Sequence, residues 1–123
     1  MDTNDMDLFI IKNAIVGKLS PLKIYLFGSY AKNTNTKYSD YDLCIIVDDK
    51  TKRKVDLSIE AELSLVNVTN MATDIIVIYE DEFLERSNYI GTLEYIVANE
   101  GELIYERESS SWYKLYNINC INR

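Results

Sequence analysis

Histidine is absent from this chain of 123 residues, and glycine, cysteine and proline are scarce, with four, two and one copies. The lack of histidine excludes a serine–histidine–aspartate triad, a cysteine–histidine pair, an imidazole base and histidine-ligated zinc. The two cysteines, Cys44 and Cys120, form no metal-binding motif, so we expect reduced thiols rather than a disulfide. Catalysis by this chain would therefore depend on carboxylates, hydroxyls, basic side chains or a bound metal ion.

Basic residues are also in the minority: 13 against 20 acidic ones, for a formal net charge of −7. This balance argues against direct binding to nucleic acid, whose phosphate backbone an acidic surface repels. No apolar run approaches the roughly 20 residues that span a bilayer, and the N-terminus is acidic, so we expect a cytoplasmic protein without membrane contact. The length fits a single domain over 1–123, with a core over about 22–106 and a tail over 107–123.

The hydrophobic pattern predicts alternating helices and strands. It indicates a helix over about 4–19 and strands over about 22–27, 40–48 and 72–79. A turn and short helix are expected over about 28–33, and a short strand over 103–105. A further helix is expected to begin at Ser87 as its N-cap and to end at Gly101, carrying Ile90, Leu93 and Val97. The predicted fold class is α/β (α+β), a small mixed β-sheet flanked by helices.

Residues 55–66 fit two patterns. Their alternating apolar residues are typical of a strand, whereas a subset of them also fits one helix face: Val55, Ile59, Leu63 and Val66. The good helix formers at 60–63 favour the helix, and we predict a helix with that face.

The tail differs in character from the rest of the chain. Three serines at 109–111 precede a segment that contains four apolar residues: Trp112, Leu115, Tyr116 and Ile118. These side chains can either pack back on the domain or bind a partner, and the sequence leaves both interpretations open.

The most informative motif is Gly28-Ser29, followed after ten residues by Asp40-Tyr41-Asp42, with apolar β-prone segments on both sides. A strand that turns at Gly28 into a short helix would present free backbone N–H groups to a phosphate. Glycine permits close approach of the ligand, and the Ser29 hydroxyl can donate a hydrogen bond to a phosphate oxygen. On a strand, Asp40 and Asp42 point to the same side, and such paired carboxylates favour a hard cation such as Mg²⁺.

Two segments, Gly28-Ser29-Tyr30-Ala31-Lys32 and Ser39-Asp40-Tyr41-Asp42-Leu43, resemble the motif of the polymerase β-like nucleotidyltransferase superfamily. A third acidic residue on a neighbouring strand completes that family's site, and Asp74 matches it. The resemblance extends from about Lys23 to about Glu106, and the small size is similar to that of the minimal nucleotidyltransferase (MNT) proteins. The chain departs from the commonest pattern, Arg then Gly, at Lys32 and Asn33, and lysine lacks the bidentate fork of arginine.

The resemblance implies a nucleotidyltransferase fold, a helix between the two acidic strands, and transfer of a nucleoside monophosphate to a hydroxyl, with AMP from ATP the expected group. Asp40 and Asp42 would hold two Mg²⁺ ions, and Asp74 beside the second ion would orient or deprotonate the acceptor. The triphosphate would be bound by the remaining motif residues: Gly28, Ser29 and, more weakly, Lys32. Apart from the resemblance, three tyrosines lie close enough to the motif in sequence to be candidates for nucleotide contact: Tyr30, Tyr38 and Tyr41.

The resemblance also implies a partner. MNT proteins paired with HEPN-domain toxins are similar to antitoxins, so we expect a HEPN-type toxin whose tyrosine accepts the group. A non-catalytic antitoxin that neutralises by binding is an alternative. A small-molecule transferase similar to the aminoglycoside nucleotidyltransferases is a second alternative, although the chain has no second domain to build an acceptor pocket. The sequence leaves open the acceptor, the nucleotide, the number of groups transferred and the oligomeric state.

Overall fold

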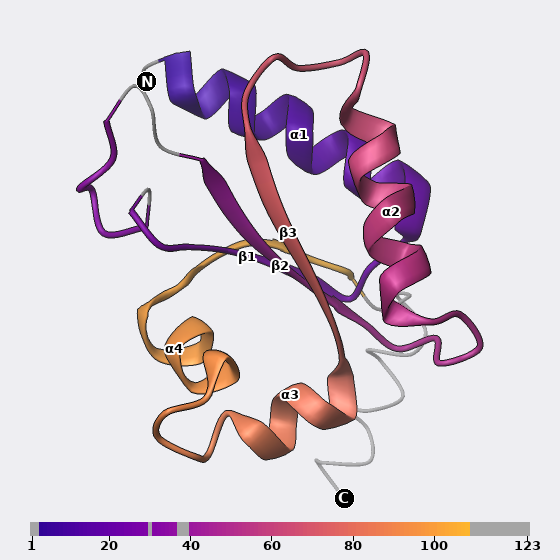
Figure 1. Ribbon diagram of the computed structural model, residues 1–123, viewed down its shortest axis with the longest axis vertical. Helices are drawn as coiled ribbons and strands as arrows, with labels where there is room; N and C mark the ends of the chain where they lie inside the picture. Colours follow the sequence, from indigo (N-terminus) through magenta and orange to yellow (C-terminus); the bar gives the residue numbers. More distant parts are fainter. Residues whose placement is uncertain (1–2, 30, 37–39, 109–123) are drawn as a thin grey trace, which may run out of the picture.

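The computed structural model of the protein describes residues 3–29, 31–36 and 40–108. Along these residues the elements are α1 (Thr3–Leu19), β1 (Lys23–Phe27), β2 (Tyr41–Val47), α2 (Lys54–Leu65), β3 (Thr73–Tyr79), α3 (Glu80–Arg86), α4 (Leu93–Glu100) and β4 (Glu102–Glu106) (Figure 1).

The strands form one mixed sheet in the order β3-β2-β1-β4. The pairs β1–β2 and β1–β4 are antiparallel, whereas β2 and β3 run parallel and are joined through α2. A parallel pair needs such a crossover, because the chain must return to the same end of the sheet before the second strand begins. The predicted α+β fold with a small mixed sheet is confirmed.

Helices cover both faces of the sheet, and each face has its own core (Figure 1). Alternate residues of β2 divide between the two cores, because successive side chains of a strand point to opposite faces. Leu43 and Ile45 pack with α1 and α2, whereas Cys44 and Ile46 pack with α3 and α4. Burial raises the pKa of the Cys44 thiol to about 12, which agrees with an inert, reduced cysteine.

Most of the predicted elements are present within one or two residues of their expected bounds. This holds for the helix over 4–19, the strands over 22–27, 40–48 and 72–79, and the short strand over 103–105. The apolar spacing in α1 marks the buried face of the helix, since Ile11 and Ile15 are fully buried against the sheet.

Residues 55–65 are helical, as predicted, but the apolar face noted in the sequence is not the face that packs on the core. The buried side of α2 consists of Leu57, Ala61 and Leu65, at a spacing of four residues. Val55 and Leu63 instead are 52% and 65% exposed. Both faces of α2 are apolar, so periodicity alone could not decide which of them meets the core.

The predicted helix from Ser87 to Gly101 is also partly wrong. Ser87 ends α3, a helix that the hydrophobic pattern did not reveal, and Ile90 lies 84% exposed in the loop that follows. The later helix begins at Thr92, whose hydroxyl accepts a hydrogen bond from the Tyr95 N–H at 3.0 Å. Its apolar residue Val97 is buried as expected, and the helix ends at Gly101.

The side chains of the tail at 112–118, and Cys120, lie outside the described residues. Among the helices of the described part of the chain, none is both long and apolar enough to cross a bilayer.

Candidate active site

Two aspartates lie side by side on neighbouring strands of the sheet. Asp42 on β2 is in register with Asp74 on β3, one residue pair after the point where these parallel strands begin. Asp42 shares its face of the sheet with Cys44 and Ile46, which contact the core under α3 and α4. The two carboxylates therefore occupy the α3/α4 face, at the strand ends opposite to the end where β3 continues into α3.

The charges at this end repel one another. Burial raises the pKa of the half-buried Asp42 carboxyl, and the negative charges of Asp74 and then Asp40 raise it further. Asp40, immediately before β2, and Asp74 are both exposed. Asp40 and Asp74, the other two aspartates predicted for the site, thus lie near enough to Asp42 for their charges to act on its carboxyl.

Gly28 brings the backbone directly against this acidic group. The residue follows β1, whose last residue Phe27 pairs with Asp42, and it has a φ of +74°. A Cβ atom at Gly28 would lie only 2.2 Å from the Asp42 Oδ2 atom. Glycine is required here both for the backbone conformation and for the space beside the carboxylate.

The short helix predicted over about 28–33 is absent, because the described residues of this segment form turns. The Lys32 N–H donates to the Gly28 carbonyl at 3.2 Å, as in one turn of helix, and the Thr34 N–H donates to the Ser29 carbonyl at 2.9 Å. Asn33 then adopts a left-handed conformation with a φ of +58°, which stops a helix at once. This segment, residues 28, 29 and 31–34, is called the Gly28 turn below.

Asn33 and Lys32 are the two departures from the commonest family pattern, and the structure shows the setting of each. Asparagine is the residue that best replaces glycine in the left-handed region, so Asn33 keeps the turn. The Lys32 ammonium forms an ion pair with the Glu100 carboxylate at 2.9 Å, and both side chains are about half exposed. The predicted phosphate contact of Lys32 would therefore compete with Glu100.

The donor set suits a divalent cation in its chemistry, since it offers hard carboxylate oxygens and a surplus of negative charge around Asp42. Within the described residues, however, no three acidic or cysteine side chains converge closely enough to enclose an ion. The strands thus place the carboxylates as neighbours, and a bound ion would require their side chains to turn inwards.

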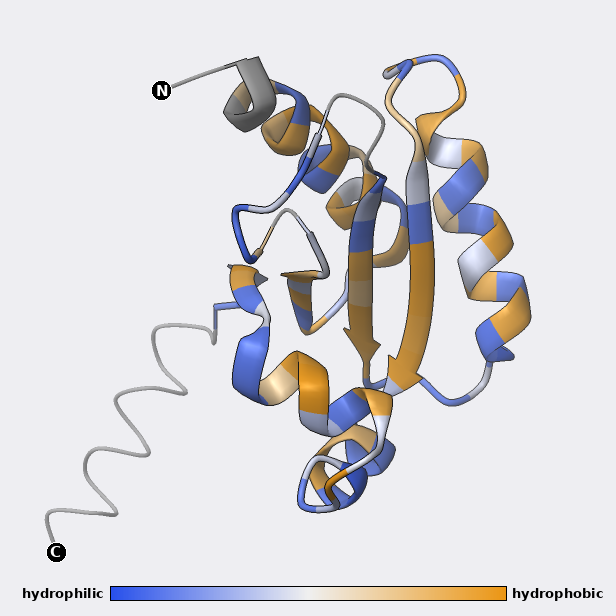
Figure 2. Cartoon of the chain, turned by 60° about the vertical axis from the view of Figure 1, so that its left-hand side comes forward, coloured by the Kyte–Doolittle hydropathy of each residue, from blue (hydrophilic) through white to orange (hydrophobic). Residues whose placement is uncertain are grey.

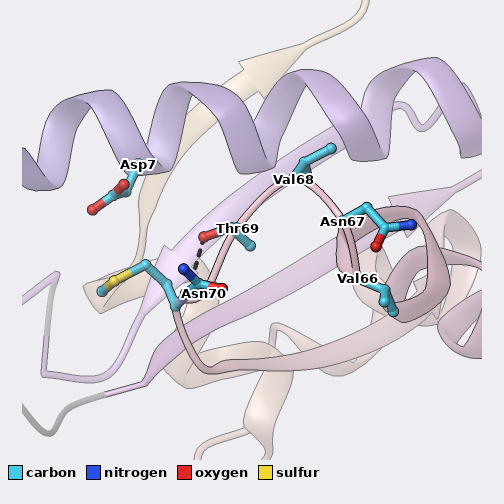
Figure 3. A pocket seen from close by; sticks show the side chains of 7 residues that line it. Asp7, Val66, Asn67, Val68, Thr69 and Asn70 are labelled. Carbon is cyan, nitrogen blue, oxygen red and sulfur yellow. Dashed lines mark hydrogen bonds between the residues drawn. The ribbon is translucent and has the colours of Figure 1, made fainter.

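A cavity lies away from this acidic group. It has a volume of about 490 Å³ and is lined by Asp7 of α1 and by the loop between α2 and β3, Val66–Met71 (Figure 3). Met71 packs against the core of the α1/α2 face, which places this cavity on the opposite face from the acidic group. Its size alone does not make it the reaction site.

Tyr41 is excluded as a candidate for nucleotide contact, because its side chain is fully buried in the core of the α1/α2 face. On a strand it points away from the face of its neighbour Asp42. The other two candidates, Tyr30 and Tyr38, lie outside the described residues.

The pattern of the nucleotidyltransferase domain family matches residues 8–109, which include the Gly28 turn and all three aspartates. The chain belongs to this family. The match covers most of the chain, and with it the sheet and helices described above. The observed mixed sheet is the fold expected of a nucleotidyltransferase.

A shorter stretch of this nucleotidyltransferase is similar to a protein of Methanocaldococcus jannaschii assigned as a protein adenylyltransferase. The two are 49% identical over 35 residues, which make up 28% of this chain and 24% of that protein. The matched stretch therefore spans about a quarter of the relative's length.

Solved structures resemble the fold of this nucleotidyltransferase. A Sulfolobus solfataricus protein assigned as a nucleotidyltransferase superposes with a TM-score of 0.55 at 20% identity, over 87% of this chain and 89% of that one. A toxin–antitoxin structure with AMP-PNP gives a TM-score of 0.48 at 19% identity, over 90% of this chain and 84% of that one. At 20% identity, the likeness to the Sulfolobus solfataricus protein concerns the fold alone.

Proposed function

We propose that this nucleotidyltransferase moves an adenylyl group from ATP to a hydroxyl at the site formed by the Gly28 turn and the three aspartates. The observation that carries the proposal is the contact between the two motifs: the backbone at Gly28 leaves no room for a Cβ atom beside the Asp42 carboxylate. Asp74 stands in register with Asp42 on the next strand. A phosphate cradle and an acidic pair thus share one end of the sheet.

Each residue has a role in this proposal. Gly28 lets the triphosphate approach the backbone, and the Ser29 hydroxyl donates to a phosphate oxygen. Lys32 exchanges its ion pair with Glu100 for a phosphate oxygen. These contacts would hold the α-phosphorus next to the acidic group, where the acceptor hydroxyl can approach it in line.

Asp40, Asp42 and Asp74 would hold two Mg²⁺ ions, which neutralise charge on the triphosphate and lower the pKa of a bound hydroxyl. In the reaction the acceptor oxygen forms a bond to the α-phosphorus, the bond from that phosphorus to the bridging oxygen breaks, and pyrophosphate leaves. Asp74 would accept the proton of the acceptor hydroxyl, since no histidine exists in the chain to act as the base.

For the acceptor we propose a tyrosine of a HEPN-type toxin, in line with the resemblance of the motifs to those of the MNT proteins. The added adenylyl group would bring negative charge to the toxin's RNA-cleaving site and repel the RNA backbone there. The chain would then act as an enzymatic antitoxin.

The test is to co-purify the protein with its partner from the native host and to measure both intact masses after incubation with ATP and Mg²⁺. We expect the partner's mass to rise by one or more adenylyl groups with the wild-type protein and to stay constant with Asp40→Asn. In co-expression, only the wild-type protein should rescue growth. Full rescue by Asp40→Asn, with no gain of mass in the wild-type pair, would instead establish neutralisation by binding alone.

A further inference from the structure

Helix α2 carries an apolar face that nothing in the described part of the chain covers. Four aliphatic residues form this α2 stripe: Val55, Ile59, Leu63 and Val66, which are 52%, 52%, 65% and 64% exposed. The stripe lies roughly opposite the buried residues of the same helix, so it points away from the sheet. Hydrophobic colouring is visible along the outer side of α2 in Figure 2.

The chain leaves the sheet beside this helix. After β4, the Arg107 N–H donates to the Leu22 carbonyl at 2.8 Å. The Arg107 guanidinium donates to the Asp48 carboxylate at 3.1 Å and to the Ser20 carbonyl. Ser20 and Asp48 line the same small cavity as Lys52, Leu57 and Glu60 of the segment that begins α2. Arg107 therefore lies next to the first turns of α2, two residues before the C-terminal segment, residues 109–123, in the sequence.

The C-terminal segment has the length to reach the stripe. From Arg107 to Trp112 the chain can span up to about 17 Å, whereas the 12 residues of α2 are about 18 Å long. If the segment is helical, Trp112, Leu115 and Tyr116 share one face, at the spacing of three and four residues.

Helix α2 and the C-terminal segment also carry opposite charges. Helix α2 has three acidic residues, Asp56, Glu60 and Glu62, and a single basic one, Lys54. The segment 109–123 has two basic side chains, Lys114 and Arg123, and no acidic one, in a chain with a net charge of −7. A basic apolar segment is therefore tethered beside an acidic apolar helix.

We infer that residues 109–123 fold back over the α2 stripe, with Trp112, Leu115 and Tyr116 against Ile59 and Leu63. A tethered segment has an effective concentration of about millimolar and needs little area to bind. The face of α2 is about 18 Å by about 10 Å, roughly 200 Å². A stable interface between separate molecules buries about 800 Å² on each partner, so a second copy would be held poorly by this face.

The sequence provides a direct probe, because Trp112 is the only tryptophan. Its fluorescence emission and its quenching by acrylamide should be measured in the full-length protein, across a dilution series and in urea. We expect emission that is blue-shifted from that of the urea-unfolded chain, protection from acrylamide, and no change on dilution.

The decisive variant is the double change Ile59→Gln with Leu63→Gln, which keeps good helix formers at exposed positions. The matched control is Leu84→Gln on α3, where the leucine is 60% exposed. With far-UV circular dichroism unchanged, the double variant should shift Trp112 emission to the red and lose its protection, and the control should do neither.

Four results would overturn the inference. Wild-type emission equal to that of the unfolded chain would leave the stripe free for another protein. Protection that fades on dilution would assign it to a second copy. Native emission in the double variant would place Trp112 elsewhere, and an equal red shift in Leu84→Gln would show a non-specific effect.

Discussion

The two faces of the sheet use the same strands differently. On the α1/α2 face, Tyr41 and Leu43 of β2 are buried in the larger core, and the cavity lined by Val66–Met71 lies at its margin. On the α3/α4 face, Cys44 and Ile46 of β2 are equally buried, but the alternation continues to the half-buried Asp42. The change from aliphatic to acidic side chains along one face marks where the helices no longer cover the sheet.

The cavity and the carboxylate of raised pKa therefore lie on different faces of the sheet. The loop at Val66–Met71 provides space but no ionisable side chain, whereas Asp42 has a raised pKa at an open strand end. Perturbed ionisable groups cluster at functional sites because catalysis depends on them. Variants at the acidic end should therefore impair the reaction, whereas a variant at Val66–Met71 should not.

The largest effect is expected from Asp42→Asn, which removes a carboxylate that would hold metal. Nucleotidyl transfer should fall by about a thousandfold, because metal-ion stabilisation of the transition state is worth several kcal/mol. Transfer is measured as radiolabelled adenylyl group on the partner. A variant with full transfer but weakened Mg²⁺ binding would contradict the role of Asp42.

Asp42→Asn should also change how stability depends on pH. The folded pKa of Asp42 is raised, so its contribution to stability is present in full below the unfolded pKa and is lost as pH rises through the folded value. Urea unfolding should therefore show a smaller loss of stability between acidic and neutral pH for Asp42→Asn than for wild type. Asp49→Asn is the opposite control, since hydrogen bonds from Thr51 lower the pKa of Asp49 and its stabilisation is lost as pH falls.

The next effect is expected from Gly28→Ala. The new Cβ would meet the Asp42 carboxylate and displace it, and a misplacement of about 1 Å can cost about a hundredfold in rate. The positive φ adds about 1–2 kcal/mol of strain. Gly91→Ala is the matched control, because Gly91 also has a positive φ of +97° but has nothing within 4 Å of an added Cβ. Equal loss of transfer in both variants would show that backbone strain alone is responsible.

A smaller effect is expected from Ser29→Ala. Loss of one hydroxyl that donates to a phosphate should weaken nucleotide binding by about 1 kcal/mol, or about fivefold. Calorimetry with a non-hydrolysable ATP analogue and Mg²⁺ measures this. Unchanged affinity would remove Ser29 from the nucleotide site.

The smallest effect is expected on the opposite face. Asn70→Ala alters the lining of the cavity at Val66–Met71, and we expect it to leave nucleotide affinity and transfer at wild-type values. A loss of transfer as large as that of Ser29→Ala would show that this cavity takes part in the reaction, and the two faces would not differ as proposed.

The sequence was sufficient for features that short-range patterns determine. Apolar, β-prone runs located β1, β2 and β3. Asp42 lies on β2 as expected, whereas Asp40 immediately precedes that strand. Register between strands then brought Asp74 to Asp42, a relation that the family motif implied and periodicity could not have provided.

The wrong predictions were those that required tertiary information. Both faces of α2 are apolar, and only packing selects Leu57 over Ile59 for the core. Helix α3 is seven residues long, too short for periodicity, although its acidic first turn and Arg86 in its last turn are a helix-dipole signal that was available. The turn at Asn33 ends a helix that the motif alone predicted, because its left-handed φ is a property of the folded backbone.

The most direct test of the acidic end as the nucleotide site is an NMR titration of the isotope-labelled protein with Mg²⁺ and a non-hydrolysable ATP analogue. We predict that the amide resonances of Gly28, Ser29, Asp42 and Asp74 shift most, that the Asp42→Asn variant loses these shifts, and that Val66–Met71 remains unaffected. Shifts concentrated at Val66–Met71, or equal shifts in Asp42→Asn, would contradict the assignment of nucleotide binding to the α3/α4 face.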